Sequence, residues 1–205
     1  MASRLLQVLL LLYRATPEET RQLEADLLLQ RRRIFRRVLG EEARKLGCSR
    51  SAVPQSPRGE DFQYLKAISR LDARSIHNTW NQWVERRLDE LYQANPRGNR
   101  QYYLRNMERL TAARATWKDR QIALNTELTA REYARQRFFQ MNLSTNRYRL
   151  TGPPPVCEVC ARQFAAGVVD YAHVQRNPAP LHINCPHQWT PITPGTVNCA
   201  DLWMG

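Results

Sequence analysis

The sequence predicts a mainly α-helical protein that ends in a small α+β module. Three observations lead to this prediction: long stretches with apolar residues at helical spacing, a change of composition near residue 150, and a cluster of cysteines and histidines after it. Residues 1–150 are expected to form a basic, elongated helical body, and residues 151–205 a proline-rich, zinc-knuckle-like Cys/His module. A chain of 205 residues can bury one core and carry a small appended unit.

The first segment, residues 1–13, is rich in leucine. Its apolar run of about nine residues is too short to span a bilayer. A signal-peptide core is the alternative, but only Arg4 precedes the run and no small-residue cleavage site follows. We therefore expect a helix that packs on the core or on a partner.

A long helix is expected to begin at Thr16-Pro17-Glu18-Glu19. The Thr16 hydroxyl and the Glu19 carboxylate can cap the first turn reciprocally, and proline lacks the amide donor that would be left unbonded there. Gly47 is the expected C-cap, and residues 49–59 read as a loop. The expected buried stripe consists of Leu23, Leu27, Ile34, Phe35, Val38, Leu39 and Leu46.

Two further helices are expected, over residues 61–92 and from residue 99 to about 145. Asn95-Pro96-Arg97-Gly98 separates them, and neither glycine nor proline interrupts residues 99–151. A helix of about 45 residues would be nearly 70 Å long, which exceeds the diameter of a compact domain. We expect it either to break or to pack partly on something outside this chain.

The helical pattern stops at Gly152-Pro153-Pro154-Pro155, because proline has no amide donor and restricts the preceding residue. The rest reads as loops with two short strands, near residues 167–172 and 188–192. Too few apolar residues remain for an independent core. This segment therefore needs a cross-link, a metal ion or docking on the helices.

The cysteines and histidines of this segment have the spacing of metal ligands. Cys157-x-x-Cys160 is a metal-knuckle spacing, and His182-x-x-Cys185-x-His187 can complete a tetrahedral site. We expect Zn²⁺ at Cys157, Cys160, His182 and Cys185, with His187 as the alternate to His182. Four protein ligands leave no open position, so the ion would be structural. Small buried thiols, or a Cys157–Cys185 disulfide, are the alternatives.

The formal net charge is +12 and the isoelectric point is about 10.1. Residues 151–205 hold two arginines against three carboxylates, so the excess positive charge lies entirely in residues 1–150. Such an excess indicates an anionic partner, although solvated helix faces are the alternative. The arginines expected to contact a partner or DNA are Arg31, Arg32, Arg36, Arg131 and Arg135.

Residues 120–192 resemble the minor head proteins of tailed bacteriophages related to that of phage Mu. The likeness lies in the order of four features: the Thr126-Glu127 helix, the basic-aromatic segment at residues 146–150, the paired cysteines, and residues 180–187 with the short strand after them. The resemblance implies a non-enzymatic virion component near the portal vertex, which contributes to head assembly or to genome packaging and ejection. The implied partners are the portal protein, the major capsid protein and, without sequence specificity, packaged DNA.

The resemblance places the chain in the virion head after synthesis in the host cytoplasm, without a membrane or a small-molecule substrate as partner. Reduced thiols are expected there, and Cys48 and Cys199, which have no companion motif, are expected to be buried or incidental. A zinc-bound HNH-like nuclease is the main alternative, with Asp170 and His173 as its candidate residues. A DNA-binding regulator is a third, although no recognition-helix spacing is visible.

Overall fold

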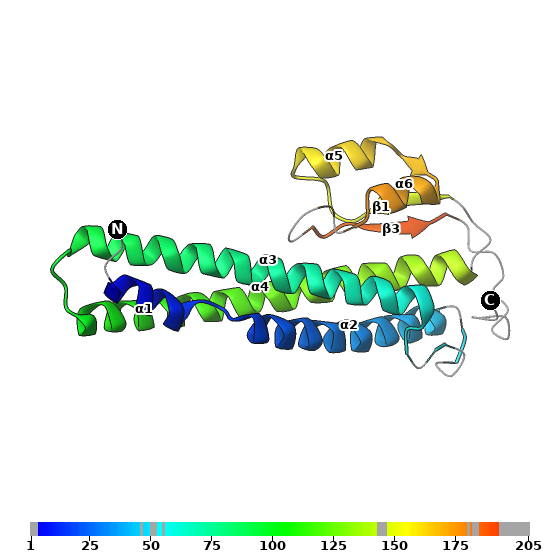
Figure 1. The fold of residues 1–205 in the computed structure, drawn as a ribbon. Coiled ribbons are helices and arrows are strands. Elements are labelled where there is room, and N and C mark those ends of the chain that lie inside the picture. Colours follow the sequence, from blue (N-terminus) through cyan, green and yellow to red (C-terminus); the bar gives the residue numbers. More distant parts are fainter. Residues whose placement is uncertain are drawn as a thin grey trace. The chain divides into compact units, whose positions relative to one another are not determined.

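A computed structural model of the chain describes residues 4–45, 47–49, 53–54, 56–142, 147–179, 181 and 185–192. Helix makes up 74% of it, which confirms the mainly helical class with a small C-terminal α+β region. The elements, labelled in Figure 1, are α1 (Arg4–Tyr13), α2 (Pro17–Lys45), α3 (Gly59–Ala94), α4 (Arg100–Asn142), β1 (Tyr148–Thr151), α5 (Glu158–Ala165), β2 (Val168–Val169), α6 (Tyr171–Arg176) and β3 (Gln188–Pro191).

Helix α2 begins and ends as local chemistry predicts. The amide of Thr16 donates to the Glu19 carboxylate at 2.7 Å, and the amide of Glu19 donates to the Thr16 hydroxyl at 3.2 Å. The hydrogen bond from the Thr16 amide is the main reason why the pKa of Glu19 is lowered. At the other end Gly47 has a φ of 77°, and its amide donates to the Arg44 carbonyl. The capping box and the glycine C-cap are both confirmed.

Helix α4 is continuous over its 43 residues, so it does not break. At 1.5 Å per residue it is about 65 Å long. Among its buried apolar residues, Tyr103 and Met107 lie four residues apart in the first half, and Ala130, Ala134 and Phe138 follow one another at the same spacing in the second. Each half therefore buries its own stripe.

The chain divides into two compact units. The first comprises Met1–Leu28 and Gln63–Ile122, and the second comprises Leu29–Phe62 and Ala123–Gly205. The Cys/His region thus belongs to the same unit as the second halves of α2 and α4. The division into domains at residue 150, which the composition suggests, stays a prediction.

In the first unit α1 packs on the core, which is one of the two positions expected for the leucine-rich segment. Leu9 is fully buried against α3 and α4, in a cluster with Trp83, Val84, Leu88, Tyr103 and Met107. The other side of α1 is exposed at Val8, Leu11 and Leu12. None of the helices that the structure describes combines the length and the apolar character that crossing a membrane requires.

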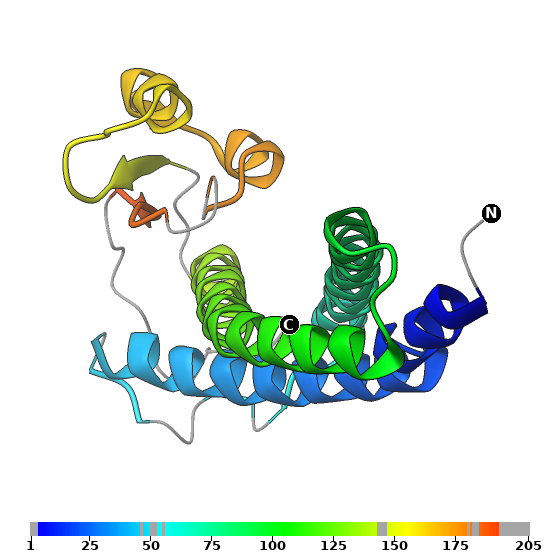
Figure 2. The ribbon, with the colours of Figure 1, turned by 90° about the vertical axis from the view of Figure 1, so that its left-hand side faces the viewer.

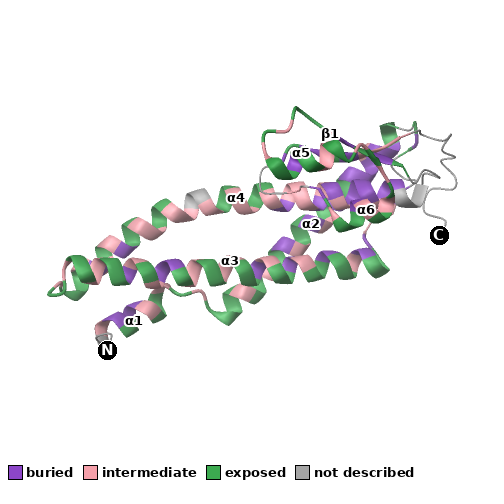
Figure 3. Ribbon diagram, turned by 90° about the horizontal axis from the view of Figure 1, so that it is seen from above, coloured by how far each residue is buried: buried purple, intermediate pink, exposed green. Residues whose placement is uncertain are grey.

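In the second unit three short antiparallel strands form a sheet in the order β2-β1-β3. Tyr148 pairs with Val169 on one side and Pro191 on the other, and Leu150 pairs with Trp189. Helix α5 contacts β1, and Figure 2 shows it alongside that strand. Tyr148, Leu150 and Trp189 are buried, as is much of the last part of α4 (Figure 3). The two strands expected from sequence are confirmed as β2 and β3, whereas the expected loops contain two short helices, α5 and α6.

Candidate metal centre

The first half of the candidate centre lies at the start of helix α5. Cys157 is the N-cap of this helix, and its sulfur accepts a hydrogen bond from the amide of Cys160 at 3.4 Å. Cys160 stands in the first turn and is buried, with 1% of its surface exposed. The two-residue separation therefore brings both thiols to the same end of α5, because the chain turns into a helix between them.

The second half comes from the segment that leads into β3. The Cys185 sulfur lies 3.7 Å from the Cys160 sulfur and 3.4 Å from Nδ1 of His187. These three ligand atoms are within 4.8 Å of one another, and all three residues are buried. Around one tetrahedral zinc ion, two sulfurs would be about 3.8 Å apart and a sulfur and a nitrogen about 3.6 Å. The group therefore has the geometry to hold a metal ion.

The ring of His187 is oriented by groups outside the cluster. Its Nε2 lies 2.9 Å from the carbonyl oxygen of Pro153, and its ring packs in a T-shaped arrangement with that of Phe164, with ring centroids 5.0 Å apart. A carbonyl can only accept, so Nε2 carries the proton and Nδ1 presents its lone pair toward the thiols. This is the arrangement in which a carbonyl fixes the tautomer of a metal-binding imidazole.

Gly152 packs directly against His187. A Cβ atom at this position would lie 2.6 Å from Cδ2 of the ring and 3.3 Å from the Cα of His187. The φ of Gly152 is +146°, in a region that residues with side chains rarely adopt. Glycine is therefore required here for two reasons, the backbone turn and the space taken by the imidazole.

Burial dominates the electrostatics of the Cys160 thiol. Desolvation is the largest cause that raises its pKa to about 12, and contacts with the thiols of Cys157 and Cys185 add to it. Those contacts place Cys157 beside the three clustered ligands. A metal ion would have to displace protons from these thiols, so binding would release protons and strengthen as pH rises.

Glu132 on helix α4 joins β3 to the helical part of the second unit. Its carboxylate accepts hydrogen bonds from the backbone amide of Trp189 at 3.3 Å and from the Gln136 side chain at 3.1 Å. Arg135 contacts the same carboxylate, donates to Glu42 on α2 at 3.1 Å and bonds the side chain of Gln188. Burial raises the pKa of Glu132 to about 7, against the opposing effect of Arg135.

The structure describes three of the five expected ligand residues as one cluster with a fourth beside it. It brings together Cys160, Cys185 and the alternate residue His187, with Cys157 alongside. His182, the first choice for the histidine ligand, lies outside the described residues. Cys157 and Cys185 are both free thiols, so the alternative of a disulfide between them is wrong.

Asp170 and His173, the candidate residues of the alternative nuclease, have structural contacts. The carboxylate of Asp170 caps helix α6 by accepting from the amide of His173 at 2.8 Å. Nε2 of His173 lies 2.7 Å from the side-chain oxygen of Gln163, and the ring packs edge-on against Trp189. The Asp170 carboxylate therefore caps a helix rather than orienting the imidazole of His173.

Two of the five arginines that were expected to contact a partner are buried. Arg31 has no exposed surface, and the side chain of Arg135 is 8% exposed within its ion pairs. Burial removes both from the residues that can reach an external phosphate. Arg32, Arg36 and Arg131 keep access to solvent, and Arg131 is paired with Glu127 one turn away.

The expectation of a buried or incidental thiol is confirmed for the burial of Cys48 and wrong for its thiol. This residue is buried and disulfide-bonded. The sequence contains no indication of this disulfide, because Cys48 has no neighbouring cysteine and follows a helix of ordinary composition.

Comparison of the chain with protein-family models, with curated proteins and with solved structures found no match. The functional inference therefore depends on the chain's own residues and geometry.

Replacing Gly152 by alanine is expected to weaken metal binding by about tenfold or more, which is the usual effect of disturbing a group that orients a metal ligand. The new methyl group would displace the His187 ring, whose Cδ2 lies 2.6 Å from the added Cβ. Titration with Co²⁺, followed by its visible absorption, measures the affinity. Gly167→Ala is the matched control, since Gly167 also has a positive φ but no atom within 4 Å of its Cβ position. Equal affinities of the two variants would contradict the assigned role of His187.

Replacing Glu132 by glutamine is expected to remove a pH dependence of stability. The pKa of Glu132 is about 7 in the folded protein and near 4.5 in the unfolded chain, so protonation of this carboxyl favours folding. This contribution to stability is complete below pH 4.5 and is lost as pH rises to 7. The wild type should thus lose on the order of 3 kcal/mol relative to Glu132→Gln over that window. Urea unfolding at pH 4.5 and pH 8 measures the difference. A constant difference between the two proteins would show that the Glu132 carboxyl is not buried as described.

Proposed function

We propose that this chain is a non-enzymatic minor head protein of a tailed bacteriophage, bound near the portal vertex, and that its second unit is organised by a structural zinc ion. The single observation that carries the proposal is the buried Cys160, Cys185 and His187 cluster, because it coincides with the signature on which the family resemblance rests. The ion would serve folding and the module would serve docking in the virion head.

The other features of the resemblance lie in the same compact unit as the cluster. Thr126 is buried in α4, and Glu127 pairs with Arg131 at 3.2 Å, as expected for a packing residue and an ion pair one turn away. The basic-aromatic segment becomes strand β1, which pairs with β3. This co-location supports the proposal, since four motifs spread over about 70 residues of sequence serve one structural unit.

Zinc is the metal that the donor set favours. Thiolates and imidazole are soft or borderline ligands, which suit zinc better than magnesium or calcium. We assign Cys157, Cys160, Cys185 and His187 as the four ligands. With all four positions taken by protein there is none for water or substrate, so the ion stabilises the fold and catalyses nothing.

The small sheet of this unit needs a cross-link such as a structural metal ion. The sheet has ten residues in three strands, which is too little apolar surface to fold unaided. A zinc ion would join the start of α5 to the segment before β3, while Glu132 and Arg135 hold β3 on α4. The result is a small rigid module packed on helix α4, which suits a protein that has to dock at one place.

A protein partner is also supported by the first unit. Val8, Leu11 and Leu12 are exposed on α1, with 43%, 77% and 57% of their surfaces accessible. Apolar residues gathered on one side of a short helix are typical of a surface that another protein covers. The portal protein, and after it the major capsid protein, are the partners that the proposal assigns.

Purified phage particles from the source culture test this function. Quantitative mass spectrometry should find the chain in the head at a few copies per particle, and cross-linking should join it to the portal subunit. Cys185→Ser should lower its incorporation because the zinc site is lost, whereas Gly167→Ala should be incorporated normally. A chain that is abundant in the lysate but absent from particles would overturn the proposal.

A further inference from the structure

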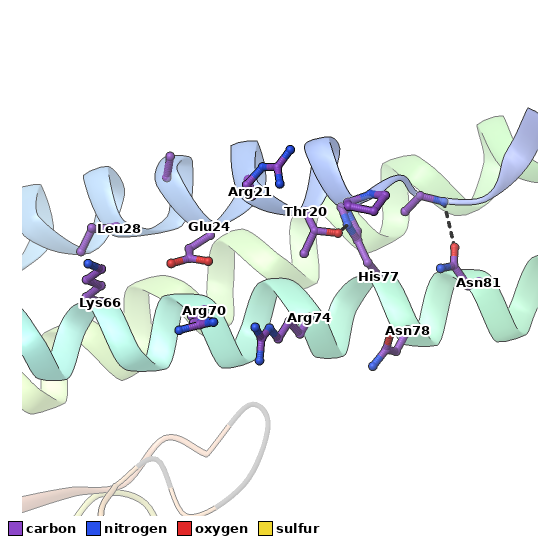
Figure 4. A pocket seen from close by; sticks show the side chains of 13 residues that line it. Thr20, Arg21, Glu24, Leu28, Lys66, Arg70, Arg74, His77, Asn78 and Asn81 are labelled. Atoms are coloured by element: carbon purple, nitrogen blue, oxygen red, sulfur yellow. Dashed lines mark hydrogen bonds between the residues drawn. The ribbon is translucent and has the colours of Figure 1, made fainter.

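A polar groove runs along the first unit between the beginning of α2 and the middle of α3 (Figure 4). Its volume is about 1020 Å³. At one end two hydrogen bonds join the walls, from the Ala15 amide to Asn81 and between Thr20 and His77, both at 2.8 Å. All residues that line it belong to the first unit, so the zinc-binding region takes no part in it.

The lining is strongly basic. Lys66, Arg70 and Arg74 follow one another at intervals of four residues on α3, and Arg21, which is paired with Glu18, lines the groove from α2. Among the described residues that line the groove, Glu24 is the only carboxylate. Residues four apart are separated by about 6 Å along a helix axis, so the three cations of α3 form a row along the groove.

The row on α3 is not neutralised by the protein. Within the part of the chain that the structure describes, Lys66, Arg70 and Arg74 form no ion pair, and all three are exposed. Some other arginines do have carboxylate partners, such as Arg14 with Glu85 and Arg87 with Glu90. Three unpaired cations that line the same groove indicate an anion supplied from outside the chain.

The lining residues also indicate which kind of anion fits. As far as the chain is described, they include no phenylalanine, tyrosine or tryptophan, so they offer no platform on which unstacked bases of a single strand could lie. Leu28 is the one large apolar side chain, which is too little to anchor an acidic amphipathic helix. Guanidinium groups in a row, by contrast, match a series of phosphates through bidentate hydrogen bonds.

We propose that this groove binds the sugar-phosphate backbone of duplex DNA without sequence preference. Lys66, Arg70 and Arg74 contact phosphates, and Glu24 limits the affinity by repelling them. The chemistry of the groove does not depend on the proposed function, whereas the identification of the duplex as packaged genome rests on it. These residues differ from the five arginines that the sequence suggested.

Fluorescence anisotropy of the full chain with a labelled random-sequence 30-base-pair duplex tests the proposal, at 50 to 200 mM salt. The double variant Arg70→Ala/Arg74→Ala should bind about tenfold more weakly, and its slope of log affinity against log salt should be smaller by about 2. Glu24→Gln should bind more tightly than the wild type. Arg105→Ala/Arg109→Ala is the matched control, because these two exposed arginines of α4 have the same spacing and lie outside the groove.

Unchanged affinity of the groove variant, or an equal loss in the control, would overturn the assignment. So would tighter binding of a single strand or of an acidic polyglutamate peptide than of the duplex. The substituted residues are exposed, so circular dichroism should show unaltered helix content in every variant. Groove-dependent DNA binding by a chain that is absent from particles would refute the head-protein proposal and leave this inference standing.

Discussion

The hydrogen bond from the backbone amide of Trp189 to the carboxylate of Glu132 connects the small sheet to the helical part of its unit. The sheet depends on such links because three strands of two to four residues cannot bury a core of their own. Trp189 is fully buried, its indole donates to the Asn177 carbonyl at 2.8 Å, and its ring packs on His173. Strand β3 therefore joins α4, α6 and the segment that carries Cys185 and His187.

The helices were predictable because their limits depend on residues close in sequence. Thr16 and Glu19 bond to each other, and Gly47 can adopt its positive φ without a side chain, so neither needs tertiary contacts. Helices α5 and α6 are eight and six residues long, and their stability comes from packing, which periodicity does not record. Asp170 was an available signal for α6, as an N-cap residue followed by six residues without proline or glycine.

The candidate site was predictable in part. The two-residue spacing of Cys157 and Cys160 indicated their common position, but the position of the His187 ring depends on contacts with Pro153 and Gly152, more than 30 residues away. Arg31 could have been excluded from sequence, since it stands four residues from both Leu27 and Phe35 on the buried stripe. The basic groove needs two helices at once, so the linear sequence gave no indication of it.

X-ray absorption at the zinc edge, on protein purified without chelator or affinity metal, measures whether zinc organises the second unit. We expect one zinc ion per chain with three sulfur ligands at about 2.3 Å and one nitrogen ligand at about 2.0 Å. Absence of stoichiometric zinc, or a coordination shell of oxygen and nitrogen alone, would contradict the assignment of Cys157, Cys160, Cys185 and His187 as the ligands that organise the second unit.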